Sequence, residues 1–206
     1  MDIQTLFAFL GAAIVLTIMP GPDNMFTLTQ SIINGKHAGI FTTLGLCTGL
    51  LVHILAATFG LAAIIYQSSL AFSVIKYAGA AYLLYLAYKS FKAKNASFEI
   101  TNEETFNRKS LYKKGVIMNI LNPKLSLFFL AFLPQFVDQK NNISIQMLTL
   151  GIVFLIQTLI IFMLISIFSD KIGVLFRKSP TFSKKMNYIQ GSIFTVLGLK
   201  IAFTQK

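Results

Sequence analysis

Apolar residues occur in six long blocks that short polar stretches separate. A hydrocarbon core about 30 Å thick needs roughly 20 apolar residues in helical conformation, and the blocks meet that length. A buried soluble core would instead show polar residues at helical or strand spacing within each block. The predicted spans are residues 3–22 with a half-helix continuing to 34, then 38–66, 69–91, 114–137, 144–169 and 185–204. The pattern predicts an all-α, polytopic membrane protein of about six transmembrane helices.

Composition agrees with a membrane location. Charged residues make up 12% of the 206-residue chain and apolar residues 55%, whereas a soluble domain carries about 25% charged residues. The net charge of +11 would also suit a nucleic-acid partner. We expect none, because the positions of the charges explain them better.

Lysine and arginine fall mostly in alternate loops. Thirteen of the 18 lie between spans one and two, three and four, or five and six, and four lie on the opposite side. Loops rich in these residues are retained in the cytoplasm. The distribution predicts both termini outside, and it places the hydrophilic loop 94–112 in the cytoplasm.

The basic central loop divides one transporter domain, residues 1–206, into halves of about 1–93 and 113–206. Each half holds three predicted spans. An odd number of spans makes the second half run opposite to the first across the membrane, as in many transporters. We therefore expect two inverted three-helix repeats.

Helix breakers interrupt the first span of each half. Pro20-Gly21-Pro22 lies in the first half and Asn122-Pro123-Lys124 in the second. Proline removes a backbone donor and clashes with the carbonyl four residues back. In lipid, a broken helix persists only against protein or a wet cavity. Two corresponding breaks therefore indicate a transporter binding site.

The residues after each break carry opposite charges. Asp23 or Asn24 can cap a helix that starts at the first break, and Asn122 can cap one that starts at Pro123. Each break would then offer free N–H groups to an anion. With Lys124 beside the second break and Asp23 beside the first, the site would fit a zwitterion. Two alternatives stay open: the two charges pair and only tie the halves together, or Asp23 is only a cap.

Other polar residues in the spans give weaker signals. Gly45, Gly49, His53 and Ala57 recur every four residues and predict a smooth face for close helix packing. On that face, His53 either relays protons or forms a packing hydrogen bond. Asn119 and the pair Gln157 and Thr158 either line the cavity or bond across helices.

Four motifs together resemble the lysine exporter (LysE/RhtB-type) amino-acid efflux family. They are Pro20-Gly21-Pro22-Asp23, Lys76-Tyr77-x-Gly79-x-x-Tyr82-Leu83, Gly115-x3-Asn119-x2-Asn122-Pro123-Lys124 and Phe132-x-Pro134-Gln135-Phe136. Length and span number agree as well, so the resemblance covers essentially the whole chain.

The resemblance implies export of amino acids from the cytoplasm across a bacterial inner membrane, driven by the proton gradient. It implicates Pro20, Pro22, Asp23, Asn119, Asn122, Pro123 and Lys124. Because Asp23 is the one obvious acid within a span, we expect a neutral or hydroxylated substrate, similar to homoserine or threonine, rather than a basic one. The expected partners are the amino acid, protons and the lipid bilayer, and assembly into a homo-oligomer is left open.

Other functions fit the residues less well. A heavy-metal exporter would need clustered ligands, but the two histidines, His37 and His53, are sixteen residues apart. A transmembrane electron carrier needs a cysteine pair, and the chain has only Cys47. No enzymatic nucleophile–base constellation is evident, so we expect neither enzymatic activity nor a metal or cofactor. An exporter of another small solute and a non-transporting membrane scaffold stay open.

Overall fold

A computed structural model describes residues 2–19, 21–61, 69–92, 107–138, 140–169, 171–172 and 180–203. All regular elements in these ranges are helices. In chain order they are α1 (Ile3–Ile18), α2 (Pro22–Asn34), α3 (Lys36–Leu55), the π-helix η1 (Ala56–Leu61), α5 (Ser69–Lys92), α6 (Arg108–Ile120), α7 (Pro123–Leu127), the π-helix η2 (Phe128–Phe132), the 3-10 helix η3 (Leu133–Phe136), α8 (Ile143–Ile167) and α10 (Pro180–Phe203).

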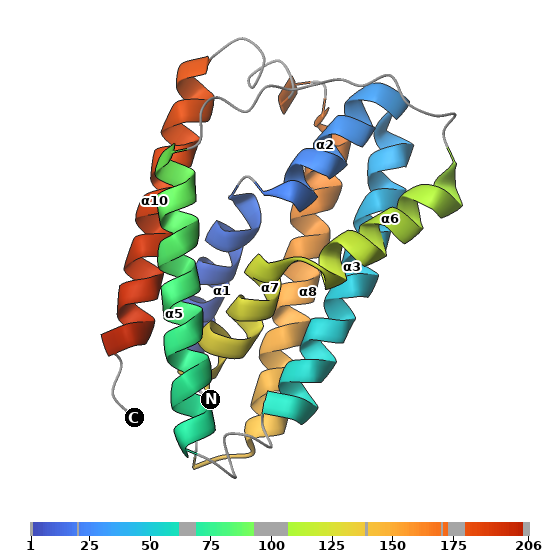
Figure 1. Cartoon of the computed structure of the whole chain (residues 1–206). Helices are drawn as coiled ribbons and strands as arrows, with labels where there is room; N and C mark the ends of the chain where they lie inside the picture. Colours follow the sequence, from blue (N-terminus) through green and yellow to red (C-terminus); the bar gives the residue numbers. More distant parts are fainter. Residues whose placement is uncertain are drawn as a thin grey trace.

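The elements form a bundle in which helices distant in sequence lie side by side. α5 packs along α10, and α3 packs along both α6 and α8 (Figure 1). The described start of α1 and the described end of α10 lie at the same end of the bundle (Figure 1). The all-α class of the prediction is confirmed in the described ranges.

Two helix pairs are bent. α1 and α2 meet at 56°, and α6 meets the segment Pro123–Phe136 at 43°. Among the described residues, Lys36–Gly60 and Ile143–Ile167 are each long and apolar enough to cross a membrane, and the number rises to four if each bent pair is one span. The chain is therefore a multi-pass membrane protein, and six spans stay a prediction.

Several boundaries differ from the predicted ones. α6 begins at Arg108, so residues 108–112 of the predicted loop 94–112 are helical. The reason is a local cap: the Asn107 side chain accepts a hydrogen bond from Ser110 N at 3.1 Å, which starts the helix among polar residues. The described part of α10 includes Pro180, so residues 180–184, which precede the predicted sixth span, are helical as well. Residues 62–66 of the second predicted span lie outside the described residues.

The predicted small-residue face on α3 is confirmed. A Cβ atom on Gly49 would lie 2.7 Å from the Val116 carbonyl oxygen of α6, and one on Gly45 would collide with the Tyr112 backbone. Gly115 presents the matching surface, since its Cβ would lie 2.6 Å from the Thr42 carbonyl oxygen. The glycines therefore let the two backbones meet, as is common in membrane helix pairs.

The core beside the second break is aromatic. Buried phenylalanines from α1, η2, η3 and α8 pack with ring centroids 5.0 to 6.5 Å apart; they are Phe9, Phe128, Phe129, Phe132, Phe136 and Phe154. Such pairs stabilise a core beyond the area that they bury. This cluster holds α1 against the segment that follows the second break.

Candidate functional site

The first break ends α1 and starts α2. The last α1 turn closes with Met19 N donating to the Val15 carbonyl at 3.1 Å. Gly21 is the N-cap of α2 and Pro22 its first residue, so the expectation that Asp23 or Asn24 caps this helix is wrong. Proline suits the first helical position, and this places both polar residues inside the first turn. Pro20 lies outside the described residues.

The carbonyls at the end of α1 are satisfied by side chains from elsewhere. In a continuing helix, the Leu16 and Thr17 carbonyls would accept from residues 20 and 21, but residue 20 is a proline and has no N–H. Instead, Lys124 Nζ donates to Leu16 O at 3.2 Å, and Asn24 Nδ2 donates to Thr17 O at 2.7 Å. The first break is therefore closed by two buried side chains.

The second break is capped locally. Asn122 is the N-cap of α7, and its Oδ1 accepts from Lys124 N at 3.0 Å. Its backbone carbonyl accepts from Leu125 N and Ser126 N, each at 3.1 Å. The expectation of free N–H groups for an anion therefore does not hold at these positions, because Asn122 already accepts from all three.

Asp23 lies between the two breaks. Its Oδ2 accepts from Asn122 Nδ2 at 2.8 Å, which joins the first half of the chain to the second. Its Oδ1 is buried and has no hydrogen-bond partner among the described residues. Only 4% of Asp23 is exposed.

Lys124 does not point along its own helix toward an anion site. Its ammonium reaches across to α1, and the described contacts of Lys124 and Asp23 include no direct ion pair between them. The two opposite charges attract each other without a direct ion pair, so the alternative that they only tie the halves together stays a prediction.

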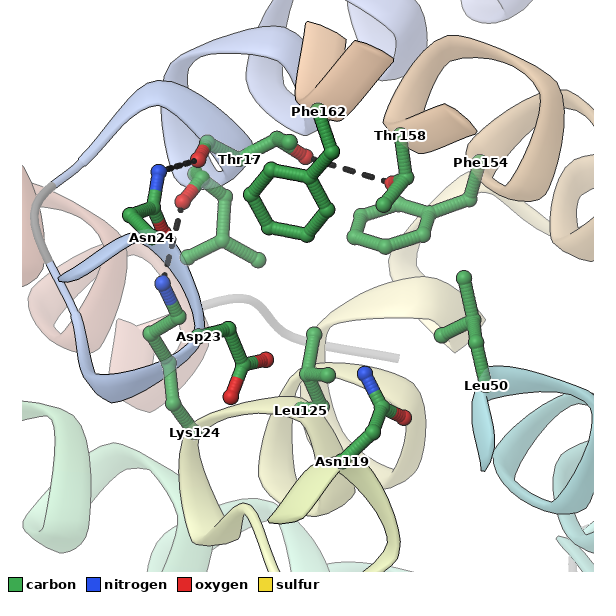
Figure 2. A pocket seen from close by; sticks show the side chains of 11 residues that line it. Thr17, Asp23, Asn24, Leu50, Asn119, Lys124, Leu125, Phe154, Thr158 and Phe162 are labelled. Atoms are coloured by element: carbon green, nitrogen blue, oxygen red, sulfur yellow. Dashed lines mark hydrogen bonds between the residues drawn. The ribbon is translucent and has the colours of Figure 1, made fainter. Parts of the chain in front are cut away.

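A small cavity lies between the two breaks (Figure 2). Six helices, α1, α2, α3, α6, α7 and α8, contribute side chains to it; the lining residues are Leu16, Thr17, Asp23, Asn24, Leu50, Asn119, Lys124, Leu125, Phe154, Thr158 and Phe162. The cavity has a volume of about 10 Å³, which is enough for about one water molecule. A larger solute would therefore require the surrounding helices to separate.

Acceptor oxygens without partners gather around this cavity. Besides Asp23 Oδ1, Asn119 Oδ1 belongs to a lining residue, and Gln157 Oε1 lies behind the lining; each is buried and without a partner among the described residues. Buried polar atoms are costly unless they are bonded. The surroundings therefore suit a group that donates several hydrogen bonds, such as an ammonium ion.

The other predicted site residues lie behind the lining. Gln157 Nε2 donates to Thr17 Oγ1 at 2.8 Å and to Thr158 Oγ1 at 2.7 Å. His53 Nε2 donates to the Asn119 carbonyl at 3.0 Å, and its ring stacks on Phe129 with centroids 6.1 Å apart. Because Pro123 lacks an N–H, that carbonyl is the one that the second break frees. The structure thus shows the hydrogen-bonded packing of His53.

Sequence reasoning missed six lining residues: Thr17 and the apolar residues Leu16, Leu50, Leu125, Phe154 and Phe162. For Thr17 a signal exists, because it is a polar residue three positions before Pro20, in the turn whose carbonyls the break frees. The five apolar residues resemble any other apolar residue of their spans, and no local signal distinguishes them. No three His, Cys, Asp or Glu side chains of the described ranges are grouped to hold a metal ion.

Comparison with known proteins places the chain in a family. A family model described as LysE type translocator matches residues 14–205. The chain belongs to this family. It is 31% identical over 202 residues to a homoserine/homoserine lactone efflux protein of Salmonella typhimurium, covering 98% of each chain.

Two further relatives carry no activity in their names. This LysE-type translocator is 31% identical over 202 residues to an uncharacterized membrane protein of Vibrio cholerae, with 98% of each chain covered. It is 32% identical over 206 residues to the uncharacterized membrane protein YrhP of Bacillus subtilis, covering 96% of this chain and 98% of that one. No solved structure matches the chain.

Proposed function

We propose that this translocator exports a neutral or hydroxylated amino acid, similar to homoserine, from the cytoplasm by proton antiport across a bacterial inner membrane. The observation that carries the proposal is Asp23, a buried carboxylate with one unpartnered oxygen, in a cavity between two broken helices. The name of the Salmonella typhimurium relative supports the substrate class.

Asp23 is the group that we assign to coupling. A carboxylate inside a membrane is costly, and such groups commonly belong to ion or proton pathways. Its free oxygen can accept either the ammonium group of the substrate or a proton, and the two exclude each other there. Binding of a proton from outside would then release the ammonium, and loss of the proton to the cytoplasm would restore the site.

The arrangement of helices supports the proposed inverted repeat. Each half consists of one broken helix followed by two longer ones: α1–α2, α3 and α5 in the first, α6–α7, α8 and α10 in the second. Corresponding helices pack on one another, α3 on α8 and α5 on α10. A two-fold relation between the halves would produce these pairings.

The basic loops support a cytoplasmic location for the end of the bundle at Gly35 and Lys92. The described start of α1 and the described end of α10 lie at the opposite end (Figure 1). We therefore propose that both termini face outward.

Transport into everted membrane vesicles with an acidic interior tests the function. We expect uptake of labelled homoserine to exceed that of lysine and to stop when an ionophore collapses the pH gradient. Asp23→Asn should abolish the gradient-driven part, whereas Asp138→Asn, at an exposed acid outside the cavity, should retain it. Full gradient-driven transport by Asp23→Asn would refute the coupling role, and lack of uptake of every amino acid by the wild type would refute the function.

A further inference from the structure

The end of α1 already holds an ammonium group, and it belongs to the protein. Lys124 Nζ donates to Leu16 O at 3.2 Å, the carbonyl that Pro20 leaves without its helical donor. A positive charge is also favoured at a helix C-terminus. Figure 2 shows this ammonium beside the Asp23 carboxylate at the edge of the cavity. The freed carbonyl, the helix end and the nearby acid together form a site for a primary ammonium.

The substrate's own ammonium would need the same atoms. It carries three N–H donors, as the lysine side chain does, and two buried acceptors that lack partners, Asp23 Oδ1 and Asn119 Oδ1, belong to residues that line this cavity. The cavity has room for about one water, so an amino acid and Lys124 in its present position cannot both occupy it. The lysine stem is flexible and has four carbons, which allows it to withdraw from Leu16 when a substrate arrives.

We propose that Lys124 is a tethered substitute for the substrate ammonium: it occupies the Leu16 carbonyl in the empty protein and leaves it when substrate binds. This inference rests on the proposed export of amino acids. Lys124 comes from the second half of the chain and Leu16 from the first, so the contact joins the halves when no substrate does.

The consequence concerns the return step of the transport cycle. A buried carbonyl without a donor, such as that of Leu16, is costly, more so where no water reaches it. Lys124 removes that cost for the empty protein as it changes the side to which the cavity opens. In the loaded protein the substrate supplies the donors. Lys124 is then a positioning residue for the return of the empty carrier, and its removal should harm net efflux more than exchange.

Reconstituted full-length protein separates the two modes. Net efflux of labelled homoserine into substrate-free buffer needs the empty carrier to return, whereas exchange of internal for external homoserine does not. We expect Lys124→Met, which keeps the apolar stem, to lower net efflux at least about tenfold more than exchange, which corresponds to the loss of a buried hydrogen bond. Lys140→Met removes an exposed lysine and should keep the wild-type ratio.

Lys124→Gln is the second variant, because its amide is uncharged but still donates. We expect the same direction with a smaller ratio. Equal loss of both modes in both variants would overturn the inference and would assign Lys124 to substrate binding or to folding. Wild-type rates of both modes in Lys124→Met would overturn it as well. If the wild-type protein transports no amino acid in either mode, the proposed function is refuted, and the inference with it. This outcome is seen in the wild type alone and so differs from a failure of the inference, which the variants show.

Discussion

At the first break the freed Leu16 carbonyl accepts from an ammonium that comes from the other half of the chain, and that ammonium lines the cavity. At the second break the freed Asn119 carbonyl accepts from the His53 imidazole and from Asn122 N at 2.9 Å. The second break is thus closed by its own turn and by a packing residue. Only the first depends on a charged group that a substrate can replace.

The difference indicates a division of labour between the breaks. The second holds its shape through the N-cap Asn122, which also donates to Asp23 and so positions the carboxylate. The first presents backbone acceptors to the cavity. Substitutions should therefore cost more stability at the second break than at the first, and only those at the first should change the ratio of net efflux to exchange.

The largest expected effect is at Asn122. Asn122→Ala removes the cap of α7 and leaves Asp23 Oδ2 without its 2.8 Å donor. Together these losses should lower the free energy of unfolding by about 3 kcal/mol. Denaturation of the purified protein in detergent, followed by circular dichroism, measures the change.

Asn122→Ser separates the two roles of this side chain. Serine is a good N-cap but is too short to replace the amide that reaches Asp23. Asn122→Ser should therefore recover about 1 kcal/mol of the unfolding free energy that Asn122→Ala loses. Transport should be impaired in both variants, because neither positions the Asp23 carboxylate. If Asn122→Ala were as stable as the wild type, Asn122 would not be what holds the shape of the second break, and the difference between the breaks would be refuted.

Asn24→Ala addresses the neighbouring carbonyl of the first break. The Thr17 carbonyl would lose its 2.7 Å donor inside the protein, which should cost about 2 kcal/mol of unfolding free energy. As a control, Asn141→Ala removes an amide that donates to Asp138 on the exposed turn, where a change within about 0.5 kcal/mol is expected. Equal effects at both sites would show that water reaches the first break.

The breaks themselves could be predicted from the sequence, because proline lacks a backbone N–H wherever it occurs, and this is a local property of the chain. The grouping of Asp23, Asn119 and Lys124 around one cavity also follows from placing both breaks at the membrane interior. The direction of the Lys124 side chain could not be predicted. It depends on the approach of α1 to α7 across 108 positions of the chain, which no local pattern encodes, and Phe154 and Phe162 enter the cavity for the same reason.

Paired glycine substitutions compare the packing at the two breaks. An Ala Cβ at Gly49 would lie 2.7 Å from the Val116 carbonyl oxygen, and overpacking against a backbone should cost about 1.5 kcal/mol. At Gly21, the nearest atom is the flexible end of Lys124 at 3.3 Å, and φ of −150° is extended backbone. Gly21→Ala should therefore cost less than about 1 kcal/mol and should alter transport by crowding Lys124.

Thermal unfolding and net efflux of both glycine variants are the measurements. We expect Gly49→Ala to be less stable than Gly21→Ala. We expect Gly21→Ala to change the ratio of net efflux to exchange more than Gly49→Ala does. A reversed ranking would place the tighter constraint at the first break.

The smallest expected effect is at His53, and it decides between proton relay and packing. His53→Phe keeps the stacked ring but removes the donor to the Asn119 carbonyl, which retains Asn122 N at 2.9 Å. Because a second donor remains, the cost in unfolding free energy should be about 0.5–1 kcal/mol. His53→Gln can still donate and should cost less. In both variants the pH dependence of gradient-driven uptake should match the wild type, since His53 does not line the cavity. If both variants fold and both lose coupling, the second break would carry protons as well, and the division of labour between the breaks would fail.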